Sequence, residues 1–152
     1  AALVAGAVIG TLYENIRSGK LEVHKGDATW VMGAKKVTTL LLMSAFAMEV
    51  AAIFVTTVTG TMLQAKDFSK WTSNAYSGLD FLKENFEFEY LTSRICFLQG
   101  LVNWIGAVAI EYAIPRKGEG QAARRMDQFV ATSLGTLIVI LLSFYNRHLT
   151  FY

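Results

Sequence analysis

The sequence has fewer charged residues than a typical soluble protein and almost no cysteine. It contains one cysteine, Cys96, which excludes an internal disulfide and disfavours a cysteine-based metal site. Charged residues make up only 17% of the chain, compared with about a quarter in soluble domains. The net charge is only +2, whereas a nucleic-acid-binding protein is expected to have a clustered basic face, so no nucleic-acid partner is expected. The sequence also has no phosphate-binding glycine loop, nucleophile elbow or Cys-x-x-Cys motif, so an enzyme is not predicted.

The sequence is instead rich in long apolar blocks, and 53% of its residues are hydrophobic. A helix that crosses a bilayer needs about 20 mainly apolar residues. Three stretches meet or approach this length, over residues 37–63, 95–114 and 129–145, and the second ends before Pro115. Residues 1–13 are a candidate for a partial fourth span. We therefore predict an all-α integral membrane protein, a single membrane domain over residues 1–152 with three transmembrane helices.

Basic residues are concentrated in two segments, before the first predicted span and after the second. Together these segments hold nine of the fourteen lysines and arginines: Arg17, Lys20, Lys25, Lys35, Lys36, Arg116, Lys117, Arg124 and Arg125. If the spans alternate in direction, both segments lie on the same side of the membrane. The positive-inside rule then predicts that they face the cytosol, stroma or matrix and that the C-terminus lies on the opposite side.

The connection between the first two spans contains a further helical pattern. Leu79, Leu82, Phe86 and Tyr90 recur at helical spacing, with charged residues on the other face. This predicts an amphipathic helix over about 78–90, on the membrane surface or against a protein. It either covers its own bundle or contacts a partner, and its acidic face disfavours adsorption to anionic lipid. Trp71, Tyr76 and Tyr90 are expected at the level of the lipid headgroups.

Glu49 is the unusual residue of the first span, because it is an acid within the apolar stretch "SAFAMEVAAIF". A charge at the centre of a spanning helix costs roughly 2.5–3.5 kcal/mol on insertion scales. We therefore expect Glu49 to be neutral, paired or bound to a ligand. Its helical face also carries Ala45, Ala52, Thr56 and Gly60, small or polar residues that allow another helix or a flat ligand to approach closely.

Three interpretations of Glu49 remain open. In the first, a protonated Glu49 hydrogen-bonds Asn103 or Gln99 of the second span. In the second, an oxygen of Glu49, Gln99, Asn103 or Glu111 binds the central magnesium of a chlorophyll, because hard divalent cations prefer oxygen ligands. In the third, Glu49 belongs to a proton or ion pathway, although the spans contain no second centrally placed acid or base.

The stretch "EYLTSRICFLQG", residues 89–100, resembles the chlorophyll-binding helix motif of light-harvesting proteins. Glu89 and Arg94 have the acid-to-arginine spacing of that motif, and Cys96 and Phe97 stand where it has Ala and Met. Thr92 replaces the His or Asn that would be a second ligand. The resemblance implies that Glu89 ligates chlorophyll and that the helix lies in a pigment environment.

Together these features predict a small accessory subunit of a larger energy-transducing membrane complex. We favour a photosystem–antenna subunit of the plastid thylakoid that contacts neighbouring membrane subunits and binds chlorophyll, with carotenoid or lipid as further candidate ligands. The alternatives are a component of an ion or proton transporter or channel that uses Glu49, and an accessory subunit of a respiratory complex in the mitochondrial inner membrane.

Overall fold

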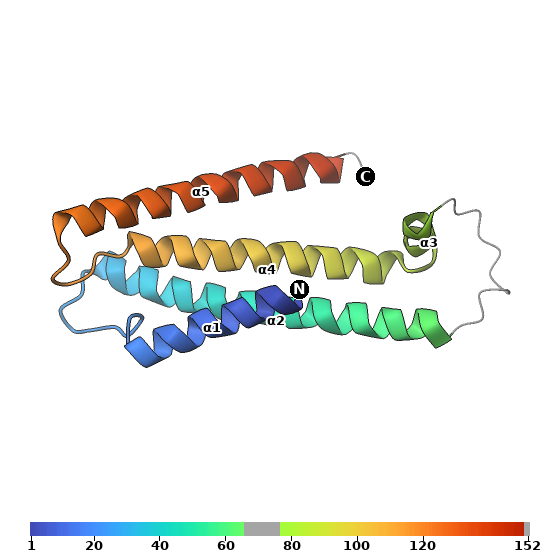
Figure 1. Cartoon of the computed structure of the whole chain (residues 1–152), viewed down its shortest axis with the longest axis horizontal. Coiled ribbons are helices and arrows are strands. Elements are labelled where there is room, and N and C mark those ends of the chain that lie inside the picture. The colour runs from blue at the N-terminus through green and yellow to red at the C-terminus, as the bar shows by residue number, and fades with distance from the viewer. Residues whose placement is uncertain (66–76, 151–152) are drawn as a thin grey trace.

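In a computed structural model, the described chain is a bundle of helices arranged lengthwise (Figure 1). The structure describes the backbone of residues 1–65 and 77–150 and the side chains of that part up to residue 147. Trp71 and Tyr76 lie outside these residues. The elements are α1 (Ala2–Ser18), α2 (Thr29–Ala65), α3 (Gly78–Asn85), α4 (Glu87–Ala113) and α5 (Gln121–Thr150). The described part contains no strand, so the all-α prediction is confirmed.

Three of these helices are long and apolar enough to cross a membrane, which confirms the predicted number of spans. They are α2, α4 and residues 121–147 of α5. Each helix begins eight residues before the apolar stretch predicted from sequence. At 17 residues, α1 is shorter than these spans and packs against α2.

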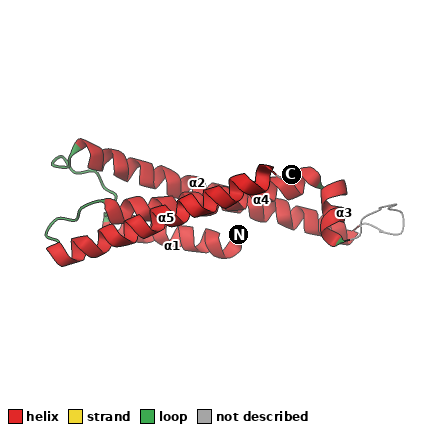
Figure 2. Ribbon diagram, turned by 90° about the horizontal axis from the view of Figure 1, so that it is seen from above, coloured by secondary structure: helices red, strands yellow, loops and turns green. Residues whose placement is uncertain are grey.

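The long helices pack in the order α2, α4, α5, and the short helix α3 packs on α4. The α1–α2 and α4–α5 connections, where the basic residues are concentrated, lie at the same end of the bundle in both views (Figures 1 and 2). α3 lies at the opposite end. The basic connections and α3 therefore lie at opposite ends of the long helices (Figures 1 and 2).

The surface helix expected over 78–90 is divided at Phe86. α3 ends at Asn85, and Phe86 leaves the helical conformation with φ −136° and ψ 40°. The residues from Glu87 onward start α4, so Tyr90 belongs to the second span rather than to the surface helix. The side chain of Phe86 is buried and lies against Phe81 with ring centroids 6.5 Å apart. Helical periodicity does not reveal this break, because the apolar spacing continues through it.

The core of the molecule is small and lies between α1, α2 and α4. Val8, Leu42, Ala45 and Ala107 are its buried members. No residue in the most apolar part of α5 is buried within the structure. The bundle therefore has an interior on one side only, and α5 contributes its surface to the surroundings.

Candidate functional site

Glu49 of α2 is completely buried, with an exposed fraction of 0%. Neither of its carboxyl oxygens has a hydrogen-bond partner among the described residues. The side chain lies beneath Gly100 of α4, so close that a Cβ at position 100 would lie 2.6 Å from Oε1. The absence of a side chain at Gly100 thus makes room for the carboxyl group.

The expected hydrogen bond from Glu49 to Asn103 or Gln99 is not formed in this structure. The Asn103 Nδ2 group instead donates to Ser44 Oγ at 3.1 Å, which connects α4 to α2. Gln99 Nε2 donates to Asn103 Oδ1 at 2.9 Å. Gln99 and Asn103 are four residues apart and therefore adjacent on one helical face. Asn103 is thus bonded to both Gln99 and Ser44, and neither amide forms a hydrogen bond with Glu49.

This burial limits what Glu49 can bind directly. A magnesium ligand must present an oxygen to an open space wide enough for the macrocycle, and here Gly100 covers the carboxyl group. Chlorophyll could reach Glu49 only if α2 and α4 separated. The hydrogen bond of the first interpretation is absent among the described residues, and burial disfavours an ionised Glu49, because an unpaired buried charge is costly.

Glu89 lines a cavity of about 260 Å³ between the end of α2, α3 and the start of α4. The α2 wall includes Gly60 and Thr59, and Phe86 and Tyr90 contribute aromatic rings. The Thr59 hydroxyl is buried without a hydrogen-bond partner in the described part of the chain. This cavity combines a carboxylate, a hydroxyl and apolar walls.

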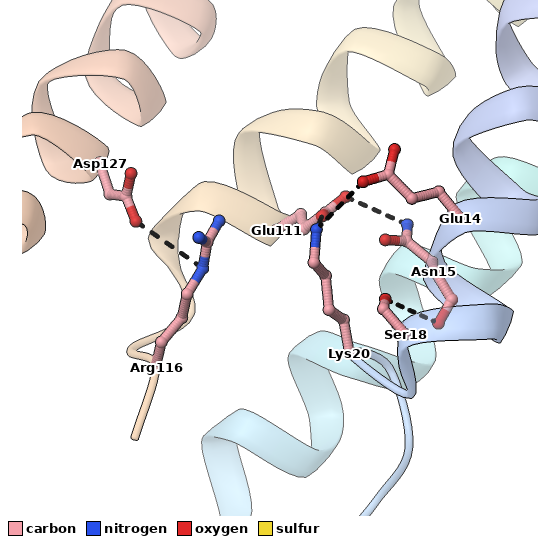
Figure 3. Close-up of polar contacts among 7 residues, drawn as sticks. All are labelled: Glu14, Asn15, Ser18, Lys20, Glu111, Arg116 and Asp127. Atoms are coloured by element: carbon pink, nitrogen blue, oxygen red, sulfur yellow. Dashed lines mark hydrogen bonds and ion pairs between the residues drawn. The ribbon is translucent and has the colours of Figure 1, made fainter. Parts of the chain in front are cut away.

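Glu111, near the end of α4, belongs to a group of polar contacts between α4 and α1 (Figure 3). Its Oε2 accepts a hydrogen bond from Asn15 Nδ2 at 3.1 Å, across 96 positions of sequence. Lys20 Nζ lies 3.8 Å from Glu111 Oε1 and 3.6 Å from Glu14 Oε1. Glu111 is thus engaged as a structural acceptor, and the sequence pattern did not reveal its partners.

A buried ion pair closes the connection between α1 and α2. Lys35 Nζ donates to Asp27 Oδ2 at 2.7 Å and to the Glu22 carbonyl at 2.8 Å. The Lys35 and Asp27 side chains are only 8% and 6% exposed. The hydrogen bond from Lys35, aided by the His24 backbone N–H, lowers the pKa of Asp27. The sequence placed Lys35 in a basic segment but did not predict its pairing with Asp27, which lies in the turn before α2.

The five predicted site residues do not form one site. Glu89 and Glu111 stand at opposite ends of α4, 22 residues and about 33 Å apart at 1.5 Å per residue. Glu49, Gln99 and Asn103 lie between them. Within the described residues, no group of three or more His, Cys, Asp or Glu side chains could hold a metal ion. No protein-family model, curated protein or solved structure matches the chain.

Proposed function

We propose that the protein is a small accessory subunit of a larger energy-transducing membrane complex, in which α5 packs against a neighbouring subunit. The observation that carries this proposal is that the most apolar part of α5 has no buried residue. Helices α2 and α4 have a shared interior, whereas the main neighbour of α5 among the described helices is α4. A span with one neighbour has most of its circumference available for partners or lipid.

The composition of α5 favours a protein partner on one of its faces. Thr132, Thr136 and Ser143 lie along this face, and each hydroxyl donates to a carbonyl four residues earlier, at 2.8–2.9 Å. Because these hydroxyls are already satisfied, the face can enter a dry interface at no hydrogen-bonding cost. Small and hydroxyl-bearing residues also permit close approach of a second helix.

Within this proposal, the complex is a photosystem with its antenna, and the protein resides in the thylakoid with its basic end in the stroma. Support comes from the light-harvesting-like stretch around Glu89 and from the cavity that Glu89 lines. Glu89 would supply the oxygen ligand to a chlorophyll, and the apolar walls would contact the ring, a carotenoid or a lipid. An accessory role in a respiratory complex uses the same α5 face without a pigment.

The alternative is a proton or ion transporter that uses Glu49. The observation in its favour is the buried carboxyl group without a partner in the described residues. Against it, the amides of Asn103 and Gln99 on the facing helix are bonded elsewhere. Gln99 donates to Asn103, and Asn103 donates to Ser44. A proton path needs a succession of exchangeable groups leading to both surfaces.

The test is to isolate the protein from its native membrane in a mild detergent, determine the size of its assembly and record its absorption spectrum. Migration within a large coloured complex is expected, and Glu89→Leu should lose chlorophyll whereas Glu87→Leu, a change at the exposed neighbouring acid, should retain it. A colourless large assembly would overturn the pigment-binding part. A free monomer in native membranes would overturn the subunit proposal, and loss of ion flux in Glu49→Gln vesicles would favour the transporter.

A further inference from the structure

A cleft of about 460 Å³ opens at the basic end of the bundle, between the α1–α2 connection and the end of α4. Its charged lining consists of four cations, Lys20, Lys35, Arg116 and Lys117, and two carboxylates, Asp27 and Glu111. Of the five site residues predicted from sequence, Glu111 alone lines this cleft. The charges in its lining are not equivalent, because some are neutralised within the protein.

Both carboxylates of the cleft are engaged by the protein itself. Asp27 is bonded to Lys35 Nζ at 2.7 Å. Glu111 accepts from Asn15 and lies 3.8 Å from Lys20 Nζ (Figure 3). The positive charge of the cleft therefore comes mainly from the pair that follows α4.

Arg116 and Lys117 are the cations available to a ligand. Arg116 Nε is 3.9 Å from Asp127 Oδ2, which is too long for a hydrogen bond. Its guanidinium lies 5.9 Å from the centre of the Tyr112 ring, so the side chain is positioned but not saturated. Lys117 is exposed and has no ion-pair partner among the described residues. Arg116 therefore forms only a long ion pair with Asp127 and keeps further N–H donors for a ligand. Guanidinium and ammonium groups both bind phosphate oxygens.

Apart from His24, the other side chains of the lining are apolar. Trp30, with 57% of its surface exposed, stands at one wall, and Leu21, Val31, Ile114 and Pro115 complete the walls. The cleft lies at the level where the candidate spans α2 and α4 begin and end. Tryptophan at the end of a span is typical of the headgroup level of a bilayer. A small soluble anion needs only the cations, whereas the apolar walls suit a ligand that also has a hydrocarbon part.

We infer that this cleft binds an anionic phospholipid, with Arg116 and Lys117 contacting the headgroup phosphate and Trp30 contacting the glycerol and the start of an acyl chain. The inference does not rest on the proposed function, because any membrane protein with this cleft would offer the same contacts. It predicts that the site retains a lipid when the bulk bilayer is replaced by detergent.

The test uses the full-length protein in neutral detergent, with phosphatidylglycerol or phosphatidylcholine added and bound lipid counted by native mass spectrometry. The variant is Arg116→Glu with Lys117→Glu. The matched control is Arg124→Glu with Arg125→Glu, which makes the same change of charge at exposed residues of α5 that do not line the cleft. Both proteins are first compared with the wild type for helix content and monomer size.

The wild type and the control should bind phosphatidylglycerol in preference to phosphatidylcholine, and the Arg116/Lys117 variant should bind it at least about tenfold more weakly. Equal loss in both double variants would mean general attraction to the basic end and would overturn a defined site. Retained binding in the Arg116/Lys117 variant would overturn it as well.

A second arm separates a lipid from a free phosphate. Inorganic phosphate is added as a competitor, and Trp30→Ala removes the aromatic wall without changing a charge. The lipid should resist millimolar phosphate, and Trp30→Ala should weaken lipid binding while Arg116 and Lys117 remain. Displacement of the lipid by inorganic phosphate, together with no effect of Trp30→Ala, would show a soluble anion site and overturn the lipid assignment.

Discussion

The Glu49 side chain occupies the space between α2 and α4 that a side chain at position 100 would need. A Cβ at position 100 would lie 2.6 Å from Glu49 Oε1 and 3.1 Å from its Cδ and Cγ atoms. Glu49 is fully buried, so its side chain has packed neighbours on every side. A change as small as one methyl group at Gly100 therefore has to displace the Glu49 side chain against these neighbours.

Gly100→Ala is expected to destabilise the protein by about 1–3 kcal/mol, the usual cost of overpacking a well-packed site. Gly106→Ala is the matched control in the same helix, because its Cβ would meet Ile138 and Leu41 at ordinary distances of 3.8 and 3.9 Å. The measurement is thermal unfolding in detergent. Combining Gly100→Ala with Glu49→Ala should restore part of the loss, and equal effects of the two glycine changes would contradict this packing.

Asp27 makes stability depend on pH at the acidic end. Its pKa is lowered from about 3.8 in the native protein, first by the hydrogen bond from Lys35 and then by the backbone N–H of His24. A lowered native pKa means that the unfolded chain binds the proton more tightly, so this stabilisation is present above about pH 3.8 and is lost as pH falls through the native pKa.

Asp27→Asn should lower the unfolding temperature at neutral pH, and the gap from the wild type should close as the pH falls below that value. The measurement is the unfolding temperature as a function of pH. Lys35→Met should be more destabilising than Lys36→Met, because Lys35 is buried against Asp27 and Lys36 is exposed. A gap between Asp27→Asn and wild type that stays constant to the lowest pH would contradict the assignment.

At the scale of elements, the contact between α2 and α4 is mainly close packing with one polar connection in the middle of the spans. That connection is the hydrogen bond from Asn103 to Ser44 at 3.1 Å, to which Gln99 adds a second amide. Interhelical hydrogen bonds in membrane proteins contribute modestly, about 0.6 kcal/mol on average. The bond therefore sets the register of the two helices more than it holds them together.

A double-mutant cycle with Ser44→Ala and Asn103→Leu should give a coupling free energy of about 0.6 kcal/mol, and no more than about 1.7. Unfolding in mixed micelles measures it. The control cycle replaces Ser44 by Ser143, whose hydroxyl bonds Val139 within α5, and should give no coupling with Asn103. Zero coupling for Ser44 and Asn103 would mean that the two side chains do not contact in the membrane.

Much of α2, α4 and α5 could be predicted as elements from sequence, because a run of apolar residues is a local property of the chain. The division at Phe86 could not. Leu82, Phe86 and Tyr90 keep helical spacing across the break, where the Phe86 side chain is buried and lies against Phe81. The ends of helices are harder to predict than their centres.

At the scale of the whole molecule, α5 is the candidate span whose most apolar part has no residue buried by the rest of the described chain. Its satisfied hydroxyl face and its exposed apolar residues present two different surfaces on one helix. If the hydroxyl face contacts a protein, a bulky residue there should interfere with assembly, whereas lipid would adapt to it.

Val139→Trp, on the face with Thr132, Thr136 and Ser143, should reduce the fraction of the protein recovered in the large complex. Leu137→Trp is the control, because two residues correspond to about 200° around a helix, and it should leave assembly unchanged. Co-purification with tagged neighbouring subunits measures both variants, with total membrane-inserted protein as the reference. Equal recovery of the two variants would mean that lipid surrounds α5 on both faces.

The sequence by itself determined the class of the protein, the number of candidate spans and the clustering of basic residues in two connections. These properties follow from the local length of apolar runs and the order of charges along the chain. The tertiary structure alone decided which polar groups meet, Asn15 with Glu111 and Lys35 with Asp27. It also decided that the Glu49 side chain packs against Gly100. The physical reason is that hydrogen bonds and steric fit act over a few ångströms, and helix packing brings together residues as many as 96 positions apart.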